Sequence, residues 1–303
     1  MKRLNLFFEI LIGSLLFTSC GPYPTPIVTV AFSLDEALAN SNSVEVLYIN
    51  SNQITELPES IGRLSQLKRL NAFDNNLSTL PESIGNLNNI LRLEFHSNNI
   101  SDIPNTIGNL VTLEKLFLGS NIITDLPSSV GDLINLKVLV LFNNQISELP
   151  ESIVELTNLE VLSISKNQLT TLPENIVELT NLEVLFISEN QLTTLPESIV
   201  KLTNLEVLSI YRNQLTTLPE NIGSLSNLEI LHVWSNHLTE LPESIGNLIN
   251  LKELIIGFNP LTSYPQSISN LTNLEKLFLT DTNIPKEDLE LLQTLLPNCE
   301  IFY

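Results

Sequence analysis

The sequence predicts an α/β repeat solenoid, in which short parallel strands from successive repeats stack side by side. Two columns of residues lead to this prediction. Asparagine recurs every 23 residues without a slip, at Asn52, Asn75, Asn98, Asn121, Asn144, Asn167, Asn190, Asn213, Asn236 and Asn259. Proline recurs at the same interval, at Pro58, Pro81, Pro104, Pro127, Pro150, Pro173, Pro196, Pro219, Pro242 and Pro265. A fixed period of this length is typical of one supersecondary unit that buries its apolar face on copies of itself.

A single unit, residues 205–222, shows how each position contributes to the predicted structure. Leu208 and Ile210 alternate as the inward side chains of a short strand. Asn213 marks the turn, where its amide can both donate to and accept from buried backbone groups of neighbouring repeats. Pro219 lacks an N–H group and has a fixed φ, which suits the first turn of a short helix or 3-10 segment. These columns are therefore interpreted as structural.

The unit resembles the leucine-rich repeat, L-x-x-L-x-L-x-x-N-x-L, in a 23-residue form that returns through Leu-Pro-x-x-Ile. The resemblance covers residues 44–284, which we divide into about 11 repeats. It implies a horseshoe with a parallel β-sheet on the concave face and short helical or 3-10 segments on the convex side. It also implies that the protein recognises another macromolecule.

Both ends of such a stack need a cap, because terminal repeats would otherwise expose their apolar faces. The stretch Ser33-Leu-Asp-Glu36 is a capping-box pattern and predicts a helix in residues 33–43. The C-terminal cap is predicted in residues 285–303, as an amphipathic helix from Lys286 to Leu296 and a last short strand. Cys299 takes an inward position in that strand, which favours a buried, unreactive thiol.

The N-terminus is predicted to direct export. Residues 1–19 combine a basic start with a short apolar run, as a secretory signal peptide does. Phe17-Thr18-Ser19-Cys20 resembles the lipobox of bacterial lipoproteins, which implies a lipid on Cys20, although Phe17 replaces the preferred leucine and Glu9 adds a charge. Residues 20–32 then form a proline-rich tether. An ordinary signal peptide with an incidental cysteine is the alternative.

Composition excludes several classes of function. The formal net charge of −20 disfavours nucleic acid, because phosphate neutralisation needs a basic face. Two cysteines and three histidines do not supply a zinc site or a disulfide framework. His96 and His232 lie six repeats apart, roughly 29 Å in a stacked sheet, so they cannot share a proton or a metal. We therefore predict no cofactor, no metal and no catalytic residues.

The residues that alternate with the inward leucines point to the concave face and are not dictated by the core. They form two zones, a basic one at Arg69, Arg92 and Lys115, and an apolar and aromatic one from the fifth repeat onward. The predicted contact residues are Arg69, Arg92, Lys115, Phe117, Phe142, Phe186, Tyr211, His232, Trp234, Phe258 and Phe278. Trp, Tyr and Arg are enriched at interface hot spots. Simple β-propensity is the alternative explanation for the apolar members.

These observations predict a monomeric, non-enzymatic protein that binds an unidentified host or envelope protein on its concave face. A lipid anchor would hold it at the membrane or surface of a bacterial cell envelope. Three alternatives remain open: an intracellular scaffold that regulates a signalling protein such as a small GTPase, a carbohydrate-active enzyme, and a passive spacer or coat protein. The absence of a close carboxylate pair on the concave face argues against the enzyme.

Overall fold

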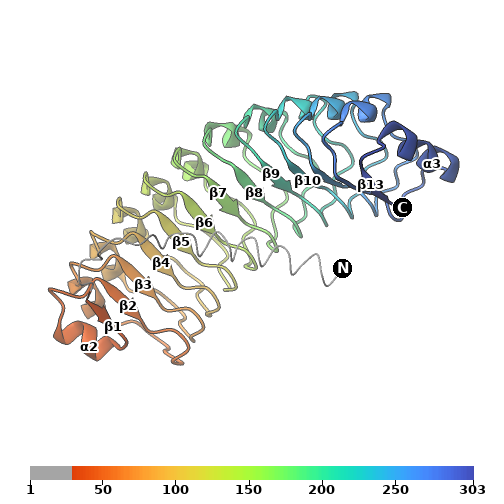
Figure 1. Cartoon of the computed structure of the whole chain (residues 1–303). Coiled ribbons are helices and arrows are strands. Elements are labelled where there is room, and N and C mark those ends of the chain that lie inside the picture. Colours follow the sequence, from red (N-terminus) through yellow and green to blue (C-terminus); the bar gives the residue numbers. More distant parts are fainter. Residues whose placement is uncertain (1–28) are drawn as a thin grey trace.

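The computed structural model describes residues 29–303, which form one curved stack of repeats (Figure 1). The described strands belong to one parallel 13-stranded sheet whose spatial order follows the sequence from β1 to β13. The sheet lines the inner side of the arc, and 3-10 segments lie on the outer side (Figure 1). The predicted solenoid is confirmed. The signal-peptide prediction and Cys20 fall outside the described residues.

Each repeat contributes one strand of two or three residues and, in most cases, one 3-10 segment. The strands are β1 (Val30–Ala31), β2 (Val46–Tyr48), β3 (Arg69–Asn71), β4 (Arg92–Glu94), β5 (Lys115–Phe117), β6 (Val138–Val140), β7 (Val161–Ser163), β8 (Val184–Phe186), β9 (Val207–Ser209), β10 (Ile230–His232), β11 (Glu253–Ile255), β12 (Lys276–Phe278) and β13 (Glu300–Phe302). The 3-10 segments are η1 (Glu59–Arg63), η2 (Glu82–Asn86), η3 (Asn105–Asn109), η4 (Ser128–Asp132), η5 (Glu151–Glu155), η6 (Glu174–Glu178), η7 (Glu197–Lys201), η8 (Ile222–Ser224), η9 (Glu243–Asn247) and η10 (Gln266–Asn270). The helices α2 (Leu34–Ala39) and α3 (Lys286–Leu295) lie at the two ends.

Neighbouring strands pair without stagger between equivalent repeat positions. Leu208 of β9 pairs with Leu185 on one side and Leu231 on the other, and all three side chains are fully buried. Because the side-chain direction alternates along a strand, the residues on either side of each leucine face the concave surface. A constant repeat length therefore aligns whole columns of side chains, both in the core and on the concave face.

The predicted asparagine ladder is present and connects successive turns. Asn167 shows its pattern, in which Nδ2 donates to the carbonyl oxygens of Leu141 and Ile164, each at 3.0 Å. Its Oδ1 accepts from the backbone N–H of Ile146 at 3.0 Å. Each buried asparagine thus satisfies backbone groups of its own repeat and of the preceding one, as buried polar groups require. Asn52 begins the column and is exposed.

A second asparagine ladder runs along the loops that lead into the strands, and the sequence analysis does not contain it. Its side chains donate to a carbonyl oxygen 24 residues earlier, over 2.7–2.9 Å. Its members are Asn89, Asn135, Asn158, Asn181, Asn204, Asn227, Asn250 and Asn273. Thr112 interrupts the column and makes equivalent bonds through its hydroxyl group. These bonds tie the exposed side of one repeat to the next.

Glycine allows the 3-10 segments of some neighbouring repeats to approach closely on the convex side. A Cβ on Gly223 would overlap the carbonyl oxygen of Ser244, and one on Gly85 would overlap that of Thr106. The same column carries Val154 and two further valines in the middle of the stack. The convex segments are therefore packed through backbone contacts in some repeats and through side chains in others.

The two caps differ from the predicted ones in detail. Ser33 Oγ accepts from the Glu36 N–H at 3.2 Å, as a capping box requires, and α2 ends at Ala39 rather than at residue 43. Strand β1 precedes this helix and pairs with β2, within the segment for which the sequence indicates a tether. At the other end, Cys299 is 4% exposed, and burial raises the pKa of its thiol to about 11. The prediction of an unreactive cysteine is consistent with both values.

Candidate binding surface

The predicted contact residues all lie along the inner side of the arc. Some are members of the strands, namely Arg69, Arg92, Lys115, Phe117, Phe186, His232 and Phe278. The others lie two or three residues after the end of a strand, namely Phe142, Tyr211, Trp234 and Phe258. The structure does not bring all of them together, because the basic zone on β3–β5 and the aromatic zone on β9–β12 lie several strands apart. The concave face therefore holds two separate groups of side chains.

The basic zone is compensated by a carboxylate that the sequence analysis did not select. Glu94 is only 5% exposed, and its Oε1 lies 2.6 Å from Arg69 Nη2 and 2.5 Å from Arg92 Nε. Asn71 Nδ2 donates to its other oxygen at 2.9 Å. Both arginines are thereby held in place by a shared partner. A further acidic group would have to compete with Glu94 for these guanidinium groups.

Aromatic rings support the same zone. The Arg92 guanidinium lies 4.7 Å from the ring centre of Phe117, a cation–π contact. His96 stacks on Phe73 with ring centres 4.8 Å apart, and burial lowers the pKa of His96. The stacked imidazole is therefore neutral at physiological pH. Arg69 and Arg92 are therefore ordered by contacts within the chain, whereas Lys115 forms no ion pair among the described residues.

The middle of the concave face combines apolar and small side chains. Phe186 packs with Val161, Val184 and Val207 in an apolar cluster that is separate from the main core. Beside it Ser188 Oγ and Ser209 Oγ form a hydrogen bond of 2.9 Å.

The aromatic zone is centred on Trp234. Tyr211 stacks on its ring with centres 4.5 Å apart, and Phe258 meets it edge-on at 6.3 Å. The Arg212 guanidinium lies 5.1 Å from the Trp234 ring centre and pairs with Glu189 at 3.2 Å. Burial, and after it the charge of Glu189, raises the pKa of Tyr211 to about 12, so its phenol stays neutral.

The predicted residues His232, Phe278 and Phe142 each contact a neighbour on the concave face. His232 Nε2 is 2.7 Å from Glu253 Oε1, and this hydrogen bond lowers the pKa of Glu253. Phe278 stacks on Phe302 of the last strand, with ring centres 4.2 Å apart. Phe142 packs over Gly119, where a Cβ would overlap its ring. Phe278 also packs against the cluster of Trp234, Tyr211 and Ile255, whereas Phe142 lies in a different part of the concave face.

Arg69 Nε, in the basic zone, is buried without a hydrogen-bond partner among the described residues, and so are two polar atoms nearer the Trp234 cluster. They are the indole Nε1 of Trp234, a residue that is 8% exposed, and the Oγ of Ser163, a residue that is 1% exposed. An unpaired buried donor costs about 1–3 kcal/mol relative to a paired one. A buried polar atom of this kind calls for an explanation such as an additional binding partner.

Backbone strain coincides with the same cluster. The residue before each ladder asparagine has a positive φ, and most repeats place a small or flexible polar residue there, as at Asp74 and Ser235. Phe258 has a φ of 54° in this column, which is unfavourable for a bulky side chain. Its ring is nevertheless 41% exposed. Strained residues that the core does not require are concentrated at functional sites.

A family model described as a leucine-rich repeat region matches residues 36–126, 124–216 and 208–296. The chain belongs to the leucine-rich repeat family. The functional domain of InlJ from Listeria monocytogenes is 25% identical, and the match has a TM-score of 0.74 over 88% of this chain and 54% of that one. The plant peptide hormone receptor RGFR1, solved in complex with RGF2, is 29% identical, with a TM-score of 0.70 over 91% of this chain and 49% of that one. No curated protein matches the chain in sequence.

Leucine-rich repeats commonly mediate protein–protein recognition, and members of this family are typically non-enzymatic recognition domains. Residues 29–303 contain no group of three His, Cys, Asp or Glu side chains that could hold a metal ion. Within the same residues, no helix has the length and apolar character needed to span a bilayer. The concave side chains are thus the features of this leucine-rich repeat protein that require a functional explanation.

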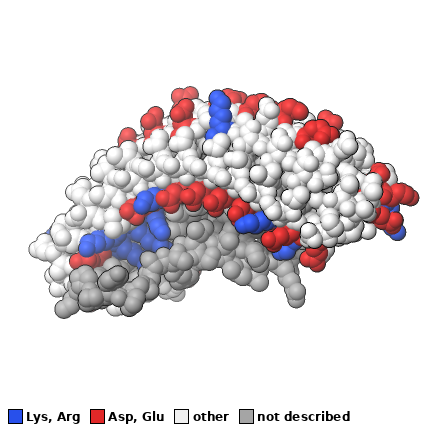
Figure 2. Space-filling model, turned by 45° about the horizontal axis from the view of Figure 1, so that its top comes forward, with Lys and Arg blue, Asp and Glu red and all other residues white. Residues whose placement is uncertain are grey.

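A row of carboxylates borders the concave face of this leucine-rich repeat protein at the start of strands β7–β9 (Figure 2). Its members are Glu160, Glu183 and Glu206, and none forms an ion pair within the described part of the chain. Partial burial, together with its two acidic neighbours, raises the pKa of Glu183. This acidic row is therefore uncompensated, in contrast to the basic zone.

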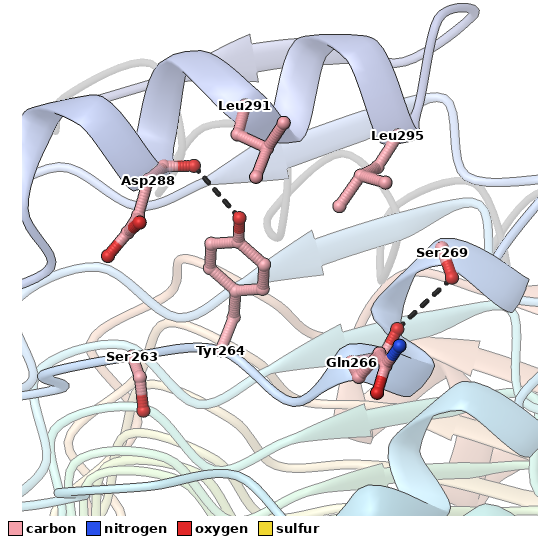
Figure 3. A pocket seen from close by; sticks show the side chains of 7 residues that line it. All are labelled: Ser263, Tyr264, Gln266, Ser269, Asp288, Leu291 and Leu295. Carbon is pink, nitrogen blue, oxygen red and sulfur yellow. Dashed lines mark hydrogen bonds between the residues drawn. The ribbon is translucent and has the colours of Figure 1, made fainter.

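A groove of about 440 Å³ lies away from the concave columns, between η10 and the cap helix α3 (Figure 3). Tyr264 Oη donates to the backbone carbonyl of Asp288 across it, over 3.0 Å. Leu291 and Leu295 point from α3 into the groove and are partly exposed (Figure 3). None of the predicted contact residues lines this groove.

Proposed function

We propose that this leucine-rich repeat protein is a non-enzymatic recognition module that binds another protein on its concave face. The observation that carries the proposal is the Trp234 cluster. The chain has a single tryptophan, and it lies on the concave face rather than in the core, with Tyr211 stacked on it and Phe258 beside it. Large aromatic groups in such a position are typical of interface hot spots.

Two further features support the proposal. The core does not need Phe258 in its strained conformation, and the buried indole N–H of Trp234 has no acceptor among the described residues. Among the structural relatives, RGFR1 was solved in complex with RGF2 and is described as a peptide hormone receptor. A repeat stack of the same fold is thus known to present a surface to a peptide.

Capture from envelope and host extracts tests this function when matched variants are compared. We expect the parent chain to retain a partner that Trp234→Ala loses, because truncation of a central aromatic anchor removes most of its contact area. Tyr264→Ala is the control, since it removes an aromatic ring from the groove beside α3 and leaves the concave face unchanged. Equal capture by all three proteins would contradict the proposal.

For the location, we propose export and lipid attachment at Cys20 in a bacterial cell envelope. The support is the sequence of residues 1–20, which follows the pattern of a lipoprotein signal. We expect Cys20→Ser to move the protein from the membrane fraction to the soluble fraction. We also expect a metabolic lipid label on the parent alone. Unchanged membrane partition of the variant would contradict the lipid anchor, and an intracellular scaffold would become the better interpretation.

A further inference from the structure

We infer that the concave face from β7 to β11 binds an extended, basic peptide segment. Its cationic side chains lie against the acidic row, and a backbone carbonyl accepts a hydrogen bond from the Trp234 indole. This inference rests on the proposed function and deepens it by naming the class of partner.

The acidic row provides charge complementarity for such a segment. On either side of the row, the same column position is neutralised within the chain, since Glu114 pairs with Lys137 and Glu229 pairs with Lys252. The three carboxylates between them have no such partner among the described residues. Adjacent strands lie about 4.8 Å apart, so the three charges fall within roughly 10 Å of one another. Opposite charges on a ligand relieve this repulsion and guide it to the face.

The buried polar groups indicate that the cationic ligand is a peptide. An indole N–H can only donate, so Trp234 Nε1 requires an acceptor such as a carbonyl oxygen. The Ser163 hydroxyl is also buried and unpaired, and it lies on β7, which starts next to Glu160. A simple polycation has no acceptor to offer these groups. An extended peptide presents a carbonyl oxygen at every residue.

The region around Trp234 offers a place for one apolar side chain of the segment. Phe258 remains partly exposed at the edge of the ring, and Gly257 on the next strand carries no side chain. The backbone oxygen of Thr280 lies 2.6 Å from the point where a Cβ on Gly257 would be, so Thr280 fills this position and the exposed part of the cluster is the Phe258 ring. A proline or an aromatic side chain can pack there against the exposed part of the Trp234 cluster.

The distances suit a short segment. Glu160 and Trp234 belong to repeats that are three strand spacings apart, about 14 Å across the sheet. An extended chain covers about 3.3 Å per residue, so about ten residues reach the acidic row and the Trp234 cluster on a diagonal path. The basic zone is a poorer receptor for a charged peptide, because Glu94 already occupies both arginines.

Fluorescence of Trp234 provides a direct test, since it is the sole tryptophan of the chain. The probes are two synthetic peptides of about ten residues that lack tryptophan, one with alternating lysines and a central phenylalanine, the other with glutamate in place of each lysine. We expect the lysine peptide to change the Trp234 emission of the full-length protein in a saturable way. We expect no response to the glutamate peptide.

Variants assign this response to the site. The triple variant with Glu160→Gln, Glu183→Gln and Glu206→Gln should bind the lysine peptide with about tenfold lower affinity. This is the loss expected when several exposed ion pairs are removed. The control carries Glu151→Gln, Glu174→Gln and Glu197→Gln, which remove the same charge from the convex segments of nearby repeats. Trp234→Phe, followed with a dye-labelled peptide, keeps an aromatic ring but removes the N–H, and should weaken binding several-fold.

The inference is overturned if the glutamate peptide binds as well as the lysine peptide. It is also overturned if both triple variants lose affinity equally, or if the lysine peptide does not bind at all. Capture of an extract protein through Trp234 without any binding of the lysine peptide would overturn this inference and leave the proposed function standing. Capture that is insensitive to Trp234→Ala would overturn the proposed function itself.

Discussion

The buried columns and the concave columns of this protein belong to the same repeats but differ in how much they vary. The ladder asparagine is identical in ten successive repeats, and it makes the same bonds from one buried position to the next. On the concave face, Tyr211, Trp234 and Gly257 occupy one column in three neighbouring repeats. The fold requires asparagine in the buried column and does not determine which residue stands in the concave column. Side chains in the concave column are therefore available for recognition.

The largest effect is expected in the buried ladder. Asn167→Leu leaves the buried Ile146 N–H without a partner, which costs about 1–3 kcal/mol, whereas the Leu141 carbonyl keeps its bond from Asn144 Nδ2. We expect the free energy of unfolding to fall by roughly 1–3 kcal/mol, measured by urea denaturation. Asn52→Leu is the control, because its side chain is exposed at the start of the column. Equal losses at the two positions would show that the ladder does not stabilise the stack in this way.

The next effect concerns binding. Tyr211→Ala removes the ring that stacks on Trp234, and we expect the affinity for a captured partner to fall by roughly 2 kcal/mol, or about 30-fold. Tyr211→Phe keeps the ring and should retain most of the affinity. Calorimetric titration measures both, and melting curves verify that each variant is folded. An unchanged affinity for Tyr211→Ala would remove the concave face of β9 from the binding site.

A further effect on stability is expected on the convex side. Gly223→Val places a side chain where the Ser244 carbonyl lies, and we expect a loss of about 1–3 kcal/mol in unfolding free energy, as for other overpacked positions. Ser269→Val is the matched control in the last 3-10 segment, which no further 3-10 segment follows. A similar loss in both variants would show that helix propensity, and not close packing, explains the glycine.

The smallest predicted effect concerns Glu183 and the pH dependence of stability. The pKa of Glu183 is raised, so the folded chain binds its proton more tightly than the unfolded chain, and the contribution of Glu183 to stability falls as pH rises from the ordinary glutamate value through the raised one. Glu183→Gln should therefore raise the free energy of unfolding at pH 7 by no more than about 0.5 kcal/mol. The gain should be visible as a slightly higher thermal midpoint. The gain in stability should vanish below pH 4, where the Glu183 carboxyl is protonated in both the folded and the unfolded chain. A loss at pH 7 would contradict the uncompensated acidic row.

Much of the fold follows from the sequence because the repeat length alone sets the register. Once Leu208 and Asn213 are placed, every equivalent residue takes the same position, and the strand-to-strand pairing requires no further information. The caps were predictable for the same reason, since the columns stop there. The end of α2 at Ala39 was less predictable, because local capping energies at a helix end are small.

The candidate site was predictable only in part. Their position in the repeat places Trp234 and Arg92 on the concave face. It does not show which side chains form hydrogen bonds or ion pairs with each other. Glu94 pairs with arginines of its own and of the preceding strand, a choice that depends on side-chain rotamers. The unpaired Trp234 N–H and the positive φ of Phe258 are likewise properties of the folded chain. They distinguish the aromatic zone from ordinary β-propensity.

The central claim is that the aromatic zone, and not the basic zone, carries binding. The most direct test is the affinity of a captured partner for the parent chain, Trp234→Ala and Arg92→Ala under one buffer condition. We expect Trp234→Ala to lose roughly 2 kcal/mol or more, and Arg92→Ala to stay within about 0.5 kcal/mol of the parent. A larger loss for Arg92→Ala than for Trp234→Ala would assign binding to the basic zone and contradict this account.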